Sequence, residues 1–225
     1  MNPRKFSFII CSNSTIHLNE CENYLAFLNM PPGYEADIIV INDAASMLSG
    51  MNEGCNATDA KYKIYMHQDV FIINPDFLIN ILKIFESDEK IGLIGMIGCK
   101  SLPADFIMWN TDQVGNIYNK STATGLIHYA FDASTDVLDV LCVDGLMMIT
   151  AYDIKPNFDL FDGWDFYDVS TSLEYHRNGY RVVVPNQSFP WCIHDDGAIL
   201  SLWNYDKYRK IALNEYKEYI NVEPM

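Results

Sequence analysis

Three polar residues in a row interrupt an apolar segment in the stretch KIYMHQDVFII, residues 63–73. His67, Gln68 and Asp69 supply an imidazole, an amide and a carboxylate, and they follow an apolar run that is typical of a buried strand. Polar side chains at the tip of a buried strand are candidate residues of a binding site. The alternative for His67 is a strand-end histidine whose ring bonds a backbone carbonyl.

Two earlier apolar runs also end in polar side chains. Ser12 follows the run KFSFIIC, and Asp43 ends the run ADIIVIND. Ligands of open α/β sheets bind at the carboxyl ends of the strands, near the point where strand order reverses. We therefore expect Ser12, Asp43 and the segment from His67 to Asp69 to line one binding site.

Glycine-rich phosphate loops are absent from the sequence. No GxGxxG motif follows the first strand, which counts against a dinucleotide or methyl-donor site, and no GxxxxGK[ST] motif occurs. Asp43 by itself would be equally consistent with a ribose-binding carboxylate of a methyltransferase. The missing glycine loop counts against that interpretation.

The first hundred residues alternate between strand and helix patterns. Apolar, β-rich runs predict buried strands over residues 5–11, 36–43, 61–67 and 90–98. Helical spacing between them predicts three helices, one carrying Leu18 to Leu28, one capped by Ser46 and one beginning at Asn74–Pro75. This order predicts an α/β fold with a mostly parallel central sheet and helices on both faces.

The middle of the chain is less regular. Residues 99–136 are rich in turn-forming residues, with a hairpin predicted around QVGNIY. Residues 137–150 predict a strand that is broken at Asp144–Gly145. A glycine inside such a run often permits close approach of a ligand or of another part of the chain.

The last third returns to a regular pattern. A helix is predicted after Tyr167, ends at Gly179 and leads into another strand. Asp168 lies at the start of this helix, where the partial positive charge of the N-terminus favours an ionised carboxylate, whereas Asp165 precedes the helix. The last twenty residues predict an amphipathic helix whose tyrosines pack against the body of the protein.

Composition limits the possible partners. The chain has 225 residues, 49% of them apolar, and a formal net charge of −15. These values predict a globular protein and count against nucleic acid or an anionic membrane as the main partner. A phosphorylated substrate would need local neutralisation, which a divalent cation supplies. The six cysteines form no CxxC pair, so we expect no zinc cluster, no disulfide framework and a reducing cytoplasm. No apolar run approaches the roughly 18 residues of a membrane span, so we expect no integral membrane segment.

Motifs of the first half resemble the nucleotide-binding half of the family-2 glycosyltransferases. The strand end IVIND matches a family strand that ends in an acidic residue, here Asp43. The segment MNEGCNATDAKY matches a helix that carries an asparagine and a glycine, Asn52 and Gly54. The segment YMHQDV matches an Asp-x-Asp motif, with His67 in the place of the first aspartate and Asp69 retained.

Motifs of the second half extend the resemblance to about residues 5–200. The family has an acidic catalytic residue about eleven positions before a glycine, and Asp168 lies eleven residues before Gly179. A strand, a proline and a histidine follow in the family, and RVVVPNQSFPWCIHDDG supplies Pro185 and His194. The wordings HQDV, VDGLMM and WDFYD are most similar to the branch called glycosyltransferase-like.

The resemblance implies the GT-A fold in one domain over residues 1–225, with a nucleotide-binding half over about residues 1–100 and an acceptor-binding and catalytic half over about residues 101–225. The expected donor contacts are Ser12, Asp43, Asn52, His67, Gln68 and Asp69. The expected ligands of a Mn²⁺ or Mg²⁺ ion are Asp69 and His194. The expected acceptor contacts are Asp144, Gly145, Trp164 and Asp165, and the expected general base is Asp168.

The implied activity is transfer of a sugar from a nucleotide-diphosphate donor to a hydroxyl of a glycan or another acceptor. One carboxylate base and direct displacement would invert the anomeric configuration. His67 in the aspartate position leaves a second hypothesis, a catalytically inactive protein that binds a nucleotide or a glycan. Asp43 leaves a third, a methyltransferase-like enzyme. His194 alternatively lies in a plain surface turn and Asp144 at a strand bulge, and the sequence has no signal for an oligomeric state.

Overall fold

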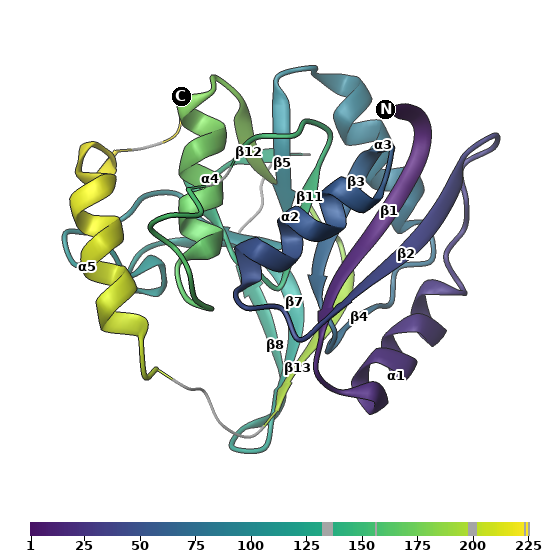
Figure 1. Ribbon diagram of the computed structural model, residues 1–225, viewed down its shortest axis with the longest axis horizontal. Helices are drawn as coiled ribbons and strands as arrows, with labels where there is room; N and C mark the ends of the chain where they lie inside the picture. Colours follow the sequence, from purple (N-terminus) through teal and green to yellow (C-terminus); the bar gives the residue numbers. More distant parts are fainter. Residues whose placement is uncertain (132–136, 156, 198–201, 223, 225) are drawn as a thin grey trace.

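A larger and a smaller β-sheet form the centre of the molecule, and helices cover both faces of the larger one (Figure 1). The computed structural model describes residues 1–131, 137–155, 157–197, 202–222 and 224. Within this part of the chain the larger sheet runs in the order β2 (Glu35–Asn42), β1 (Asn2–Ser12), β3 (Ala60–His67), β11 (Met147–Thr150), β5 (Ile91–Gly95), β12 (Arg181–Pro185) and β9 (Val137–Asp139).

The inner strands of the larger sheet are largely buried, which explains their nearly continuous apolar sequences. In β1, Phe6, Phe8 and Ile10 join one hydrophobic cluster and Ile9 joins the other. The helices α1 (Thr15–Leu25) and α3 (Phe77–Ser87) pack with the first cluster. The helices that pack with the second cluster are α2 (Met47–Ala57), α4 (Tyr167–Arg177) and α5 (Tyr205–Glu215), which a 3₁₀ turn follows at Lys217–Tyr219.

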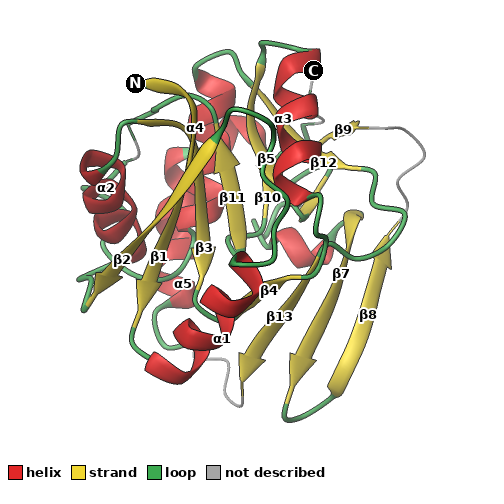
Figure 2. Cartoon of the chain, turned by 90° about the vertical axis from the view of Figure 1, so that its right-hand side faces the viewer, coloured by secondary structure: helices red, strands yellow, loops and turns green. Residues whose placement is uncertain are grey.

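The smaller sheet lies beside the carboxyl ends of β1 and β3 (Figure 2). Its order is β10 (Cys142–Val143), β6 (Ile97–Cys99), β7 (Gln113–Ser121), β13 (Cys192–Gly197) and β4 (Val70–Ile72), and β8 (Gly125–Phe131) pairs with β7. A 3₁₀ turn at Met108–Asn110 precedes β7. Phe71, Ile117 and Cys192 from this sheet belong to the same cluster as Phe6, so the two sheets share a core.

The predicted mostly parallel sheet is confirmed, and two second-half strands, β11 and β9, join it in antiparallel orientation. β1 is parallel to β2 and β3, and β12 is parallel to β5. The second-half strand β11 lies antiparallel between β3 and β5. β2 is the edge strand and is only half buried, so the prediction of a buried strand over residues 36–43 is wrong in that respect.

Three local boundaries also differ from the predictions. The run over residues 90–98 is divided between β5 and β6, which belong to different sheets. The segment QVGNIY lies within the single strand β7, and the hairpin turn comes later, between β7 and β8. Helix α3 begins at Phe77, because the Asn74 side chain accepts a hydrogen bond from the Asp76 N–H and forms a turn before the helix.

Two helix boundaries are confirmed. The Ser46 and Ser49 side chains each accept a hydrogen bond from the other residue's N–H, at 3.1 and 2.9 Å, and so cap α2. Gly179, with φ of +79°, follows α4 in the left-handed conformation that ends many helices. Among the described helices, none combines the length and the apolar character needed to cross a bilayer.

Candidate active site

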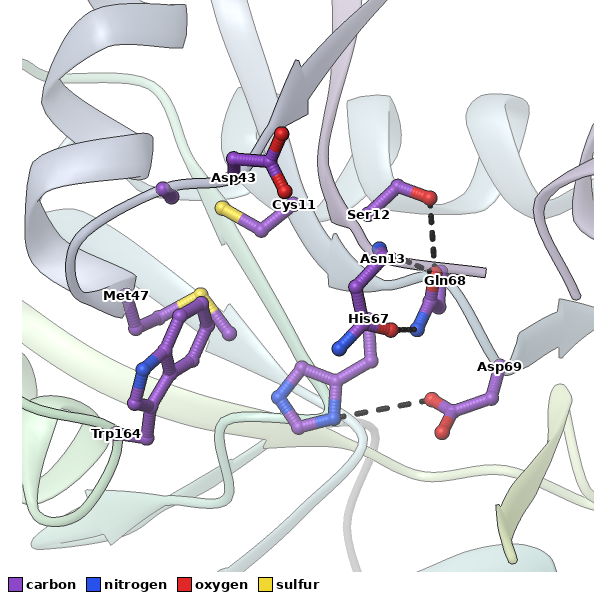
Figure 3. Close-up of a pocket in the computed structure, with 10 residues that line it drawn as sticks. Cys11, Ser12, Asn13, Asp43, Met47, His67, Gln68, Asp69 and Trp164 are labelled. Atoms are coloured by element: carbon purple, nitrogen blue, oxygen red, sulfur yellow. Dashed lines mark hydrogen bonds and ion pairs between the residues drawn. The ribbon is translucent and has the colours of Figure 1, made fainter. Parts of the chain in front are cut away.

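The carboxyl ends of β1, β2 and β3 meet at a pocket of about 380 Å³ (Figure 3). Parallel pairing brings them together, because Ser12 is in register with Asn42 and Cys11 with His67. Asp43 turns away from β2 with φ of 55°, a left-handed conformation that aspartate adopts more readily than most residues. The pocket is lined by Cys11, Ser12, Asn13, Asp43, Ala44, Met47, His67, Gln68, Asp69 and Trp164.

Gln68 holds the loop that follows β1. Its Oε1 accepts hydrogen bonds from the Ser12 hydroxyl at 2.8 Å and from the N–H groups of Asn13 and Ser14 at 3.0 and 2.8 Å. Its Nε2 donates to the Asn13 Oδ1 at 2.6 Å. Both ends of the amide are thus engaged within the protein, so Gln68 contributes to the site by fixing this loop at the edge of the pocket.

His67, Asp69 and His194 form a compact group between the two sheets. Antiparallel pairing of β13 with β4 places His194 opposite Val70, next to Asp69. The Asp69 Oδ1 lies 3.9 Å from the His67 Nδ1 and 3.7 Å from the His194 Nε2, and one ligand atom from each residue fits within 4.8 Å of the others. His194 lies in a strand and is partly buried, so the interpretation as a surface turn is wrong.

The Asp69 Oδ1 is buried and has no hydrogen-bond partner among the described residues. A buried carboxylate oxygen without a partner is costly, since it has lost its hydration. Two imidazole nitrogens lie beside it at distances too long for hydrogen bonds but suitable for ligands of a shared cation. This donor set fits a divalent metal ion.

The far side of the His67 ring is held by Tyr167. The His67 Nε2 lies 2.6 Å from the Tyr167 hydroxyl, so the ring bonds a side chain rather than a backbone carbonyl. Gly145 makes room for this contact, because a Cβ at that position would overlap the Tyr167 hydroxyl. Burial, and then the neighbouring His194, lower the pKa of His67, which favours the neutral imidazole that a metal requires.

Asp168 is anchored at the start of α4. Its Oδ1 accepts a hydrogen bond from the Val169 N–H at 2.8 Å and its Oδ2 from the Gly145 N–H at 3.1 Å. Burial, and then the charge of Asp144, raise its pKa to about 7. The expectation that the helix terminus favours ionisation at neutral pH is therefore corrected, because burial outweighs the stabilising N–H groups. A carboxylate with a pKa near 7 is well matched to general-base catalysis.

A second hollow of about 220 Å³ connects Asp168 with the first pocket. It shares His67 and Trp164 with that pocket, and Asp168 lines it. The predicted acceptor residues Asp144, Gly145 and Asp165 line the same hollow. Trp164, whose side chain is 52% exposed, thus lies between the two spaces.

A family model described as "Glycosyltransferase like family" matches residues 7–216. The chain belongs to this family. No curated protein matches the sequence. The family assignment covers both halves of the site, because the matched residues include the strand ends of the larger sheet as well as Asp168 and His194.

Solved glycosyltransferase structures share the fold of this glycosyltransferase-like protein. S. aureus TarS 1–349 in complex with UDP superimposes with a TM-score of 0.59 and 13% identity, over 97% of this chain and 67% of that one. GalNAc-T7 with UDP, GalNAc and Mn²⁺ gives a TM-score of 0.60 and 10% identity, over 96% and 49%. The chain spans 40% of the longer S. aureus TarS structure. The predicted GT-A-type α/β fold is confirmed.

Asn52 was predicted to contact the sugar donor, but it does not line the strand-end pocket of this glycosyltransferase-like protein. It lines a separate small hollow together with Cys55 and Tyr65. Its motif neighbour Gly54 lies against β1, where a Cβ would overlap the Ile9 side chain. The glycine in this motif therefore permits close packing of α2 on the sheet.

Among the lining residues that sequence reasoning missed, two have side chains that bear on the chemistry of the site, Tyr167 and Trp109. Tyr167 was passed over, although it directly precedes Asp168, because nothing in the local pattern shows that it reaches a histidine one hundred positions earlier. Trp109 lines the hollow that contains Asp168 and is 48% exposed. The signal available in the sequence was a tryptophan within the turn-rich segment of residues 99–136.

Proposed function

We propose that this protein transfers a sugar from a nucleotide-diphosphate donor to an acceptor hydroxyl, with inversion at the anomeric carbon. The observation that carries the proposal is the unpaired Asp69 carboxylate oxygen between His67 and His194, at the same sheet edge as Asp43 and beside the hollow that contains Asp168. This arrangement offers a cation position, a nucleotide pocket and a base in adjacent spaces.

Asp69, His67 and His194 would hold the cation. Two imidazoles and one carboxylate are a softer set than the oxygen ligands that Mg²⁺ prefers, so we propose Mn²⁺ as the preferred ion. When bound, the ion would neutralise the donor diphosphate and the charge that develops on it as it leaves. The Tyr167 hydroxyl would orient the His67 ring, so that its Nδ1 faces the ion.

The pocket at the strand ends would hold the nucleotide. The Asp43 carboxylate is exposed at its rim and can accept hydrogen bonds from the base or the ribose. The loop braced by Gln68 forms the opposite side. UDP in the TarS complex and UDP with Mn²⁺ in the GalNAc-T7 complex support a uridine nucleotide as the first donor to test.

Asp168 would remove the proton of the acceptor hydroxyl as that oxygen attacks the anomeric carbon. Each carboxylate oxygen accepts one hydrogen bond from an N–H group that anchors it, and its other lone pair remains available to accept the proton. A base on the face opposite the leaving diphosphate gives direct displacement, which inverts the configuration.

We further propose that the protein works in a reducing cytoplasm. The six cysteines, which are all free thiols, support this proposal.

Calorimetric titration with UDP, in the presence and absence of Mn²⁺, tests the proposal. We expect Mn²⁺ to tighten UDP binding by at least about tenfold, which corresponds to about 1.4 kcal/mol. Asp69→Asn removes the anionic ligand and should abolish this gain. Asp196→Asn is the matched control, because this exposed carboxylate lies on the same strand as His194 but outside the cation group.

Turnover provides the second readout. UDP should be released from a UDP-sugar by the parent protein with Mn²⁺ and much more slowly by Asp168→Asn, whose UDP affinity should stay close to that of the parent. Equal UDP affinity with and without Mn²⁺ in the parent protein would refute the cation site. Metal-dependent UDP binding without turnover of any UDP- or GDP-sugar would instead support the inactive binding protein.

A further inference from the structure

A groove of about 900 Å³ lies over one face of the smaller sheet, more than twice the volume of the nucleotide pocket. Its floor is made by β13, β7 and β8, which run side by side below the larger sheet (Figure 2). Trp109 and Lys100 line the groove from the segment between β6 and β7. Nothing in the proposed transfer chemistry requires so large a space beyond Asp168.

Strand register gives this groove a regular floor. His194 is in register with Asn119, and Ile117 with Tyr129, so side chains two positions apart on each strand point to the same face. The Asn119 Nδ2 donates to the Asp196 carboxylate at 3.2 Å across this face. The floor of the groove therefore presents both apolar and hydrogen-bonding side chains.

Aromatic rings stand along the outer part of the floor. The rings of Tyr129 and Phe131 are nearly parallel, at 9°, with centroids 6.0 Å apart. Tyr129 is 36% exposed, and the Trp109 side chain, 48% exposed, faces the same space. Polar groups of Thr111, Asp112 and Gln113 also line the groove. The lining therefore combines flat rings with hydrogen-bonding groups.

The inner end of the groove opens at the proposed reaction centre. Trp109, Asp144 and His194 line both the groove and the smaller hollow that contains Asp168. A ligand that extends along the floor would therefore place its inner end next to the base. The groove and the nucleotide pocket approach this point from different sides, since none of the residues lining the pocket also lines the groove.

We propose that this groove binds an oligosaccharide acceptor, with its terminal hydroxyl at Asp168 and an outer sugar on the rings of Tyr129 and Phe131. The proposal rests on the proposed glycosyltransferase function and names its acceptor class. A sugar ring offers an apolar C–H face, which packs on the electron-rich face of an aromatic ring, and a rim of hydroxyls for amide and carboxylate partners.

Charge and size narrow the acceptor further. Asp112, Asp144 and Asp196 outnumber Lys100 along the groove, so a polyanionic chain would be repelled. A purely apolar chain would leave the polar groups of the wall without partners. The distance from the smaller hollow to the rings on β8 is spanned by three strands, so we expect the acceptor to be a neutral glycan of more than one sugar.

Retention on an array of neutral oligosaccharides and monosaccharides tests the proposal, followed by calorimetry with the best-retained oligosaccharide. We expect an oligosaccharide to bind the parent protein in the absence of nucleotide and its parent monosaccharide to bind more weakly. Tyr129→Ala should weaken oligosaccharide binding by roughly three- to tenfold, the scale of one lost ring contact. Tyr129→Phe should retain it.

Leu126→Ala is the matched control, because this residue is 60% exposed on the same strand but points to the opposite face. It should leave oligosaccharide binding unchanged, and all three variants should bind UDP with Mn²⁺ as the parent does. The proposal is overturned if no oligosaccharide is retained, or if Tyr129→Ala and Leu126→Ala bind equally well. Failure of UDP binding in the parent would refute the nucleotide-sugar proposal and leave the result for the groove intact.

Discussion

Asp168 shows how one side chain combines anchoring with reactivity. The N–H groups of Gly145 and Val169 fix both of its carboxylate oxygens, yet burial and the nearby Asp144 raise its pKa to about 7. The proposed base must be ionised to accept a proton, so we expect the rate of sugar transfer to rise with pH through this pKa. Below pH 6 most Asp168 side chains would be protonated and unable to act as the base.

Asp144→Asn is expected to move the acid limb of the pH–rate profile. Removing the negative charge of Asp144 lowers the pKa of Asp168, so the midpoint should shift by roughly one unit toward lower pH. The asparagine Oδ1 can still accept the hydrogen bond that the Leu146 N–H donates to Asp144. The measurement is kcat/KM for UDP release from pH 5 to pH 9.

Asp165→Asn is the control for this prediction. Asp165 lines the same hollow, but the raised pKa of Asp168 comes mainly from burial and from Asp144, so removal of Asp165 should leave the midpoint in place. An unchanged midpoint in a folded Asp144→Asn variant would show that another group titrates in the acid limb. Both substitutions leave His67, Asp69 and His194, the proposed cation ligands, in place.

Helix α2 shows the influence of packing at the scale of an element. Its residue Gly54 is buried against Ile9 of β1, with no space for a Cβ. Glycine within a helix normally costs about 1 kcal/mol relative to alanine, so an exchange at an open position would stabilise the helix. At Gly54 the helix would have to move away from the sheet to make room for the methyl group. The same exchange should therefore destabilise the protein at this position.

Gly54→Ala should therefore lower the free energy of unfolding by about 1–3 kcal/mol, as measured by urea denaturation. Glu53→Ala, on the exposed side of the same helix, should stay within about 0.5 kcal/mol of the parent. In an Ile9→Ala background the cost of Gly54→Ala should shrink, since the overlapping side chain is gone. A stabilising Gly54→Ala would show that α2 is free to shift on β1.

At the scale of the whole molecule, the larger sheet is continuous because a strand from the second half of the chain lies within it. β11 lies between β3 and β5, so a fragment of residues 1–100 lacks the strand that joins these two parts of the larger sheet. It also lacks Ile117, Met147 and Cys192 of the shared core. Residues 1–100 are therefore not a complete unit in this fold. One domain over residues 1–225 stays a prediction.

The fragment of residues 1–100 should show no cooperative unfolding. Unpaired edges of β3 and β5 expose backbone groups and apolar side chains, which promotes aggregation. The full chain should unfold in one transition, measured by circular dichroism in urea. A cooperative transition of the fragment, with a urea dependence expected for its length, would instead indicate an independent nucleotide-binding domain.

The sequence by itself determined the elements and the edge at which the site lies. Buried strands have continuous apolar runs, Ser46 and Gly179 mark helix ends, and polar residues follow the strands at Ser12, Asp43 and His67. These features depend on neighbours within a few positions, which periodicity and capping preferences record. The candidate base Asp168 followed from the spacing of family motifs.

Only the tertiary structure decided which groups meet. The proposed cation site needs His194 beside Asp69, 125 positions earlier in the chain, and this depends on the pairing of β13 with β4. The engagement of Gln68 with the loop after β1, the displacement of Asn52 from the pocket and the raised pKa of Asp168 likewise depend on contacts between distant segments. Local sequence patterns specify how each segment folds, but sheet order and burial arise from the packing of all segments together.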